Sequence, residues 1–494
     1  MIESLAPRLR AELAWSRLLP PWPILVGLAA LARALAQPAA LLNDPDTYLH
    51  IAAGSWILAR QALPAHDPFS FTMPATHWTA PEWLAEIILA LCYRGLGWAG
   101  PVLLAAVAYA VALGLLTRFL LRRLDPLPAL VLAIAAAALL LPHLLARPHA
   151  FALPLLVAWA GVLLAARDAQ RPPPFAALPL MVLWANLHGS FAFGLALAAF
   201  LGAEAVFQAS PARRWHDGRT WAAFAIAAAV AALLTPNGLD ALVQPFRLMA
   251  MPALRSSFIE WMSPNLREFP ALEAWILGAL FLGLGAGLRL PPMRAVLVLG
   301  LVHMALQHLR HADILALVAP LAVAAPLGDR LRALSASSAL TRGLAHLARP
   351  PGALATTLAF AAAAALAAPI ALHPPARTDD PVTPRAALDF AEAHGLRGPV
   401  FNAEAFGGYL AFRGVPDFID GRIEMFGNDF LADDVAAERG NAAMLAALLG
   451  RYRIEWTLLP PGAGAVAALD RLPGWQRVYT DPYAVIHRRI APAP

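Results

Sequence analysis

Acidic and histidine side chains concentrate in one stretch of the sequence, residues 43–86, although only 14% of the chain is charged. The residues that could do chemistry there are Asp44, Asp46, His50, His66, Asp67, His77, Glu82 and Glu86. The proline of Asp44-Pro45-Asp46 stops a helix and fixes a turn, which would hold two carboxylates together. One of them could act as a general base that takes a proton from an acceptor hydroxyl, with His50 one helical turn downstream as its partner. The alternative is an exposed loop whose aspartate caps the next helix.

Two glutamates could add a metal site to this stretch. Glu82 and Glu86 are four residues apart, so they share one face of a helix. With Asp44, Asp46 or His50 they could bind a divalent cation such as Mg²⁺ or Mn²⁺, because mixed carboxylate and imidazole sites suit several metals. The alternative is a solvated helix face with an arginine partner.

Two short polar turns further along the chain could bind a phosphate. Arg147 is followed by His149, and Arg310 lies between His308 and His311. An arginine at the level of the lipid headgroups can grip a phosphate with two parallel hydrogen bonds. The alternative is generic contact with lipid headgroups.

Two further pairs of residues have an open interpretation. Asn186 and His188 interrupt a helical hairpin and either line a cavity or form a tight polar contact between helices. His66 and Asp67 either continue the site of the first loop or only shape a turn.

The composition excludes an ordinary soluble enzyme. The chain has 494 residues, is 60% hydrophobic and has a mean hydropathy of +0.60, which indicates many membrane spans. The formal net charge is +5 and all of the basic charge is arginine, which we expect in cytoplasmic loops. No basic patch with interleaved aromatic residues is present, so no nucleic-acid partner is expected. Cys92 is the only cysteine, which excludes an intrachain disulfide and a cysteine-based metal site.

The apolar runs predict a mainly α, polytopic membrane protein with about eleven spans, because a span needs roughly 20 apolar residues. We place them at 20–42, 98–121, 127–145, 151–166, 175–186, 191–207, 221–234, 271–288, 295–306, 314–327 and 353–372. Arginines before the first run put the N-terminus in the cytoplasm, and arginine-rich loops then alternate with arginine-poor ones. Residues 43–97 and 235–270 become long external loops, and the second, which includes Glu260, is a candidate lid.

Residues 1–372 therefore form a membrane domain, and residues 373–494 form a small α/β domain outside the cytoplasm. Strand-like segments in this tail lie at 399–402, 417–420, 455–459, 477–480 and 484–487, and a helix is expected at 441–449. Gly407–Gly408 is one of several turn signals. Asp420 and Arg422 are expected at a strand end, around a turn-forming Asp-Gly pair.

This architecture resembles the GT-C superfamily of integral membrane glycosyltransferases. The segments NDPDTYLH, HDPFSF and PEWLAE also look like those of a set of bacterial membrane proteins described as glycosyltransferases. The resemblance implies an inner-membrane enzyme that transfers sugar from a polyprenyl-phosphate donor to a glycan, lipid or protein acceptor. It also implies that an acidic residue of the first external loop, here Asp44 or Asp46, is the catalytic base. Arg147, Arg310 or Arg33 would hold the donor phosphate.

Two other function classes remain open. A transporter or flippase for a lipid-linked or small polar substrate would line a path with intramembrane charges. The polar residues instead gather at one face, and no inverted repeat is visible. A non-catalytic membrane scaffold is the other alternative, against which a polar external site with perturbed acids would count.

Overall fold

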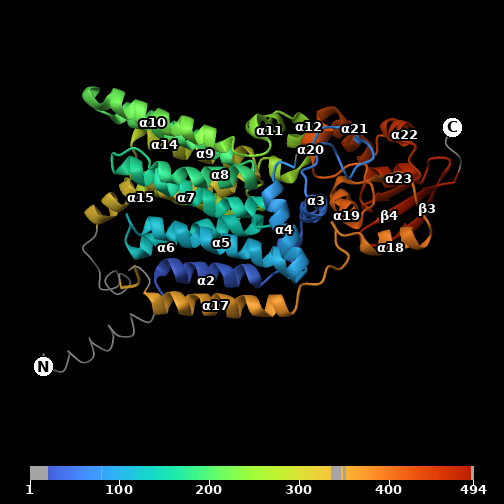
Figure 1. Cartoon of the computed structure of the whole chain (residues 1–494), viewed down its shortest axis with the longest axis horizontal. Coiled ribbons are helices and arrows are strands. Elements are labelled where there is room, and N and C mark those ends of the chain that lie inside the picture. The colour runs from blue at the N-terminus through green and yellow to red at the C-terminus, as the bar shows by residue number, and fades with distance from the viewer. Residues whose placement is uncertain (1–19, 79, 335–345, 349–351, 491–494) are drawn as a thin grey trace.

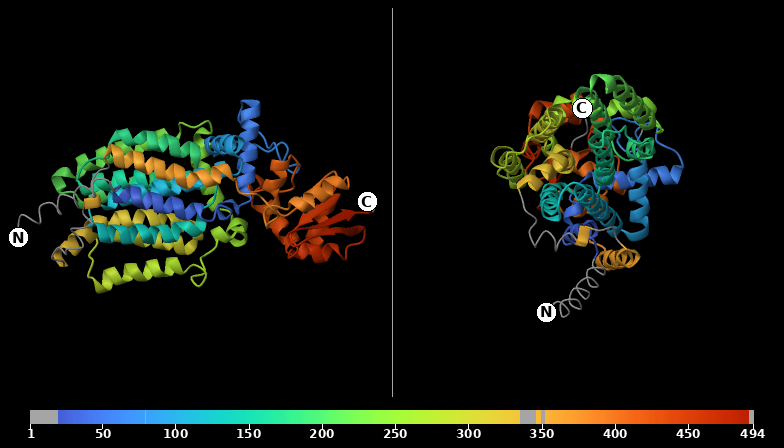
Figure 2. Two further views of the ribbon diagram at one scale, coloured as in Figure 1. Left: turned by 90° about the horizontal axis from the view of Figure 1, so that it is seen from below. Right: turned by 90° about the vertical axis from the view of Figure 1, so that its left-hand side faces the viewer.

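The computed structural model describes residues 20–78, 80–334, 346–348 and 352–490. Long helices run side by side in a bundle, and a smaller unit of helices and strands lies at one end of it (Figures 1 and 2). The expected fold class, mainly α with a small C-terminal α/β unit, is confirmed.

Each of the eleven expected spans overlaps one helix of the bundle, and several helices extend beyond the expected bounds. These helices are α2 (Trp22–Leu35), α5 (Ala99–Leu120), α6 (Pro126–Leu140), α7 (Pro148–Asp168), α8 (Leu178–Leu187), α9 (Phe191–Gln208), α10 (Pro211–Ala232), α13 (Pro270–Leu280), α14 (Pro292–Gln307), α15 (Ala312–Leu334) and α17 (Ala353–Leu372). Among the described residues, six helical segments are long and apolar enough to cross a membrane by themselves. They are Ala99–Leu120, Pro126–His143, Pro148–Asp168, Phe191–Gln208, Leu309–Ala333 and Ala353–Leu372.

Small residues set the spacing of the central helices. A Cβ at Gly114 of α5 would lie 2.9 Å from the carbonyl oxygen of Pro23, and one at Gly27 of α2 would lie 3.2 Å from that of Ala110. Such close backbone contact is the usual way in which helices pack in a membrane, where the hydrophobic effect does not drive helices together.

Buried ion pairs join the bundle at the end away from the C-terminal unit. Arg294 donates from Nε to Glu204 at 2.8 Å and from Nη2 to Asp168 at 3.1 Å, and Arg123 lies 3.6 Å from Asp168. Arg167 lies 3.8 Å from Glu204. The arginine-rich loops therefore gather at one end of the bundle, as the predicted alternation requires. Which side of the membrane this end faces stays a prediction.

Both long loops contain helices that lie between the bundle and the C-terminal unit (Figure 1). The first loop forms α3 (Asp46–Arg60) and α4 (Trp83–Leu96), close to the helices that the spacing of apolar residues predicts at 47–60 and 81–93. The second forms α11 (Gly238–Met249), α12 (Pro252–Ser257) and the short helix η4 (Ile259–Trp261).

A second hydrophobic core joins these loops to the C-terminal unit. It contains Tyr48 and Trp78 of the first loop, Trp261 of the second loop, and Phe401 and Phe418 of the tail. Because one core spans three parts of the chain, the C-terminal unit is held against the loops rather than linked to them by a tether alone.

The C-terminal unit is built on a four-stranded sheet with the strand order β1-β2-β4-β3. The strands are β1 (Val400–Asn402), β2 (Trp456–Leu459), β3 (Trp475–Thr480) and β4 (Val485–Arg489). The pair β1–β2 is parallel and the other two pairs are antiparallel. Its helices are α18 (Arg385–Ala393), α19 (Glu404–Arg413), α20 (Ile423–Phe426), α21 (Asn428–Glu438), α22 (Ala442–Arg451) and α23 (Gly464–Leu469).

Two expectations for the tail are wrong. Residues 417–420 do not form a strand of the sheet, because Asp417 makes only an isolated bridge with Ser70 and the chain then turns at Asp420. Gly407–Gly408 is not a turn but part of α19, where the missing side chains allow close backbone contact on both sides of the helix. The other strand segments and the helix at 441–449 are confirmed.

Candidate active site

Arg147 gathers three carboxylates from the two long loops. It lies directly before α7, which begins at Pro148, a residue suited to the first position of a helix. Its Nη1 donates to Asp46 Oδ2 at 3.1 Å and lies 3.2 Å from Asp44 Oδ2, and its Nη2 donates to Glu260. The predicted convergence of the first loop with the turn at Arg147 is therefore present in the structure.

Asp44 and Asp46 differ in access to solvent. Asp44 Oδ1 accepts the backbone N–H of Asp46 at 2.7 Å, and its side chain is only 3% exposed, against 26% for Asp46. Burial raises the pKa of Asp44 to about 6, although Arg147 opposes this shift. Asp44 thus fixes the turn that starts α3, and Asp46 is the more accessible carboxylate.

Glu260 lies between two guanidinium groups. Arg310 Nη1 donates to Glu260 Oε1 at 3.4 Å. The Arg310 guanidinium also stacks on Trp261, with 4.3 Å between its Cζ and the ring centroid. Burial would raise the pKa of Glu260, but Arg147 and Arg310 hold it well below its usual range. Glu260 thus marks a position suited to an anion. The sequence placed it only in a candidate lid, since a single acid in a long loop carries no spacing signal.

His50 joins Glu82, which directly precedes α4, to Glu86 in the first turn of that helix. Its Nε2 lies 3.7 Å from Glu82 and its Nδ1 lies 3.5 Å from Glu86, which confirms that both glutamates share one face. Helices α3 and α4 approach this closely because a Cβ at Gly54 would lie 2.0 Å from the carbonyl oxygen of Glu86. Burial lowers the pKa of His50, but Glu86 and Glu82 together raise it to about 9. His50 therefore pairs with these glutamates rather than with Asp46, the partner expected from sequence.

His188 extends this group toward the bundle. Its Nε2 lies 3.5 Å from Glu82, and its Nδ1 makes a 2.8 Å hydrogen bond with Ser190 Oγ. Burial and the nearby Arg310 lower the pKa of His188 to about 3, so the ring is neutral at physiological pH. Burial also raises the pKa of Glu82 to about 7, and the charge of His50 opposes this shift.

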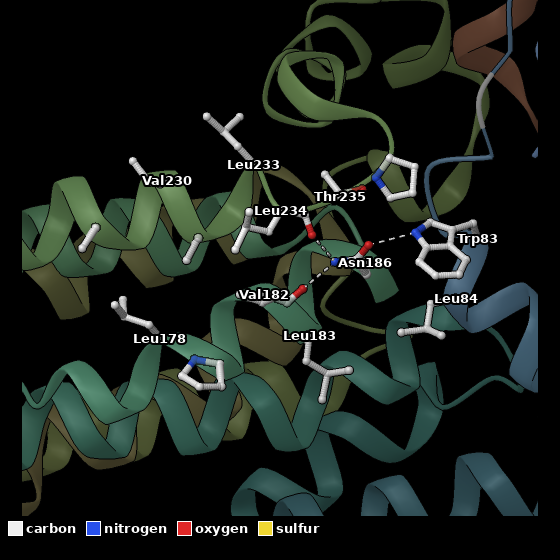
Figure 3. Close-up of a pocket in the computed structure, with 14 residues that line it drawn as sticks. Trp83, Leu84, Leu178, Val182, Leu183, Asn186, Val230, Leu233, Leu234 and Thr235 are labelled. Atoms are coloured by element: carbon white, nitrogen blue, oxygen red, sulfur yellow. Dashed lines mark hydrogen bonds between the residues drawn. The ribbon is translucent and has the colours of Figure 1, made fainter.

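An apolar groove of about 1160 Å³ has Trp83, the residue after Glu82, in its lining (Figure 3). It lies among α8, α10 and the start of α4, and its lining includes Leu178, Val182, Leu183, Val230 and Leu234. The groove therefore offers an apolar surface that begins beside the polar cluster and does not include it.

Asn186 and Trp83 form the end of the groove. Asn186 Oδ1 accepts from Trp83 Nε1 at 2.9 Å, and its Nδ2 donates to the carbonyl oxygens of Val182 and Leu234 (Figure 3). Trp83 directly follows Glu82 in the chain, so this end of the groove adjoins the carboxylate and histidine group. Asn186 thus makes a tight contact between helices and also lines the groove.

The remaining histidines of the predicted site shape its turns. His149 Nε2 bonds to the carbonyl oxygen of His143 at 3.0 Å, and its Nδ1 accepts from Arg147 Nε at 3.3 Å, an assignment that follows from these partners. His308 bonds to the carbonyl oxygen of Trp261 and His311 to that of Met304. The last two contacts fix the turn that carries Arg310.

His66 and Asp67 lie apart from the Arg147 cluster. His66 is exposed and pairs with His77 in an isolated bridge. Asp67 accepts from Arg422 Nη1 at 2.6 Å in a separate buried cluster under the C-terminal unit. His66 and Asp67 therefore lie outside the candidate active site.

Arg33, the third candidate for the donor phosphate, is an exposed residue of α2, and among the described residues no contact places it in the cluster.

The four candidate metal ligands do not fit a shared cation site. Asp44 and Asp46 face the Arg147 guanidinium, whereas Glu82 and Glu86 face His50. Across the part of the chain that the structure describes, no three His, Cys, Asp or Glu side chains are arranged to hold a metal ion. A requirement for a divalent cation stays a prediction, and no step below passes through one.

Of three comparisons with known proteins, the comparison with solved structures is the one that found matches. No family model matches the sequence, and no curated protein matches it. Among solved structures, the chain is similar to ArnT from Cupriavidus metallidurans in the apo state, with 13% sequence identity and a TM-score of 0.48. The match covers 93% of this chain and 96% of that chain.

Proposed function

We propose that this protein is a membrane glycosyltransferase that takes a sugar from a polyprenyl-phosphate donor. The observation that carries the proposal is that an apolar groove ends at Trp83, next to Glu82. Glu82 and its neighbour His188 lie near enough to Arg147 and Arg310 for the arginine charges to lower the pKa of both, so the groove opens toward an arginine-rich polar site. Such a donor has a long apolar tail and an anionic head, and these two surfaces match its two parts. The acceptor would be a glycan, lipid or protein outside the cytoplasm, and the protein would reside in a bacterial inner membrane.

The donor phosphate would bind where Glu260 now meets Arg147 and Arg310. Both guanidinium groups already hold one carboxylate, and a phosphate is an equally suitable bidentate partner for arginine. As the sugar leaves, negative charge grows on the polyprenyl phosphate, and two fixed cations stabilise that charge.

Asp46 would act on the acceptor as general base. It takes the proton of the acceptor hydroxyl while the hydroxyl oxygen forms a bond to the anomeric carbon of the sugar. The bond from that carbon to the phosphate oxygen breaks, and the polyprenyl phosphate leaves with the electron pair. Arg147 contacts Asp46 as well as the proposed phosphate position, so one guanidinium aligns base and leaving group.

The experiment follows the donor rather than an assumed product. Purified protein in liposomes receives a panel of undecaprenyl-phosphate-linked hexoses and pentoses together with envelope extract as acceptor. Mass spectrometry then measures the undecaprenyl phosphate that is released. We expect release with at least one donor, and loss of that release in Asp46→Asn and Arg147→Ala.

Two outcomes contradict the proposal. Donor that moves between leaflets without being consumed would indicate a flippase. If folded protein releases no undecaprenyl phosphate from any donor of the panel, a non-catalytic membrane scaffold explains the structure better than an enzyme does.

A further inference from the structure

We propose that the C-terminal segment Asp417–Arg422 sets the position of the Asp46 carboxylate, with Gly421 as the positioning residue. This inference rests on the proposed function, in which Asp46 is the base. It makes the C-terminal unit a part of the active site rather than a separate appendage of the membrane domain.

Gly421 touches the carboxylate itself. A Cβ at Gly421 would lie 2.0 Å from Asp46 Oδ1 and 3.0 Å from its Cγ. Asp46 Oδ2 meanwhile accepts from Arg147 at 3.1 Å. The carboxylate is therefore held between a backbone surface on one side and a guanidinium on the other, and any side chain at residue 421 would displace it.

Arg422 anchors the segment in a buried ionic cluster. Its Nε donates to both carboxylate oxygens of Asp420, at 2.9 and 3.0 Å, and its Nη1 donates to Asp67 at 2.6 Å. The guanidinium also stacks on Trp78, with 4.6 Å to the ring centroid. Arg422 is 4% exposed and Asp420 is fully buried, so loss of one partner would leave an uncompensated charge in the interior. This explains why the Asp-Gly-Arg sequence is fixed in place rather than being a free turn.

Helix α19 fixes the distance between this segment and the first loop. A Cβ at Gly407 would lie 2.1 Å from the carbonyl oxygen of Ile419, and one at Gly408 would lie 2.2 Å from that of Pro45. One helix thus meets the segment on one side and the Asp44-Pro45-Asp46 turn on the other, with backbone oxygens as the nearest atoms in both contacts. Because no flexible side chain intervenes, the segment and the turn cannot move independently.

The test compares two glycines of the same unit. Gly421→Ala places a methyl group against the Asp46 carboxylate. Gly450→Ala serves as the matched control, because among the described residues a methyl group there has no neighbour within 4 Å apart from its own helix. We expect Gly421→Ala to lower the kcat of donor consumption by about ten- to a hundred-fold, as a displacement near 1 Å would. Binding of undecaprenyl phosphate should stay within twofold of wild type, and Gly450→Ala should match wild type in both measurements.

A double-variant comparison separates positioning from general packing. In the Asp46→Asn background, Gly421→Ala should lower the residual rate no further, because the group that it misplaces is already inactive. An additive loss in that background would overturn the inference, as would a Gly421→Ala protein that behaves like Gly450→Ala.

A measurement of thermal stability tests the contact between Gly421 and Asp46 without an assay of sugar transfer. If Gly421→Ala lowers the melting temperature in detergent, Asp46→Ala in the same chain should restore it, since it removes the atoms that the new methyl group meets. A loss of stability that persists in the double variant, or no loss together with an unaltered rate, contradicts the contact. Full activity of Asp46→Asn would instead refute the proposed function and not the contact.

Discussion

Asp46 and Asp44 share one guanidinium, but only Asp46 has a quarter of its side chain open to solvent. We predict that Asp46→Asn lowers donor consumption by about a hundred- to ten-thousand-fold, because asparagine keeps the shape of the side chain but cannot accept the proton. Asp44→Asn should lose far less, since asparagine can still accept the Asp46 N–H. Release of undecaprenyl phosphate at equal protein levels measures both. Full rates in both variants would show that the base lies elsewhere.

Glu82 should make stability depend on pH. Burial raises its folded-state pKa from 4.5 to about 7, so the folded protein holds a proton that the unfolded chain has lost over that range. The stabilisation is complete below about pH 4.5 and is lost as the pH rises through about 7. Each pKa unit corresponds to about 1.4 kcal/mol. The contribution of Glu82 to the melting temperature in detergent should therefore fall between about pH 4.5 and pH 7.

Glu82→Gln, which cannot ionise, should flatten the part of that fall near pH 7. Some fall should remain, because the pKa of Asp44 is raised in the same direction, to about 6. Glu273→Gln changes an exposed glutamate of α13 and is the control. Equal pH profiles for wild type and Glu82→Gln would mean that Glu82 is ionised in the fold at neutral pH.

The sequence predicted the meeting of Asp46, Arg147 and Arg310 because alternating turns of a bundle reach the same end. It did not predict the partner of His50. That partner depends on Gly54, which lets α4 approach α3 so closely that Glu82 and Glu86 face the ring. Such a contact between two helices depends on their packing, which spacing along one helix does not contain.

At the scale of the elements, the groove beside α8 and α10 has a specific consequence for the donor. Val182→Trp would fill part of the groove next to Asn186. We expect the KM for an undecaprenyl-linked donor to rise about tenfold, while a donor with a two-isoprene chain, which cannot extend along the groove, keeps its KM. Val131→Trp, at an exposed position of α6, is the control for adding a large side chain. An equal change for both donors would mean that the groove does not hold the chain.

Helix positions were predictable because long apolar runs permit few alternatives. The segment at 417–420 was not, although its central Phe418 and Ile419 are residue types that favour a strand. Its acids are buried against other groups: Asp420 pairs with Arg422, which also holds Asp67 of the first loop. The contact between Arg422 and Asp67 joins residues 355 positions apart. It outweighs the local preference for a strand, because a buried charge must be paired.

At the scale of the whole molecule, the polar site and the arginine-rich loops occupy opposite ends of the bundle. Reporter fusions after Arg214 and after Arg377 should report the cytoplasmic and the external side respectively. The structure supports this choice, since Arg377 contacts Tyr48 and the carbonyl oxygen of Leu42 at the site end. A cytoplasmic signal after Arg377 would mean that the predicted topology is inverted and that the site faces the cytoplasm, where an external acceptor cannot reach it.

The central claim is that a polyprenyl phosphate binds with its head at Arg147 and Arg310 and its chain in the groove. An electron cryomicroscopy structure with undecaprenyl phosphate tests it most directly. The account predicts phosphate density between the two guanidinium groups, with the Glu260 carboxylate displaced from them, and chain density between α8 and α10. Phosphate density at another place, or a chain lying only on the outer surface of the bundle while Glu260 keeps both arginines, would contradict it.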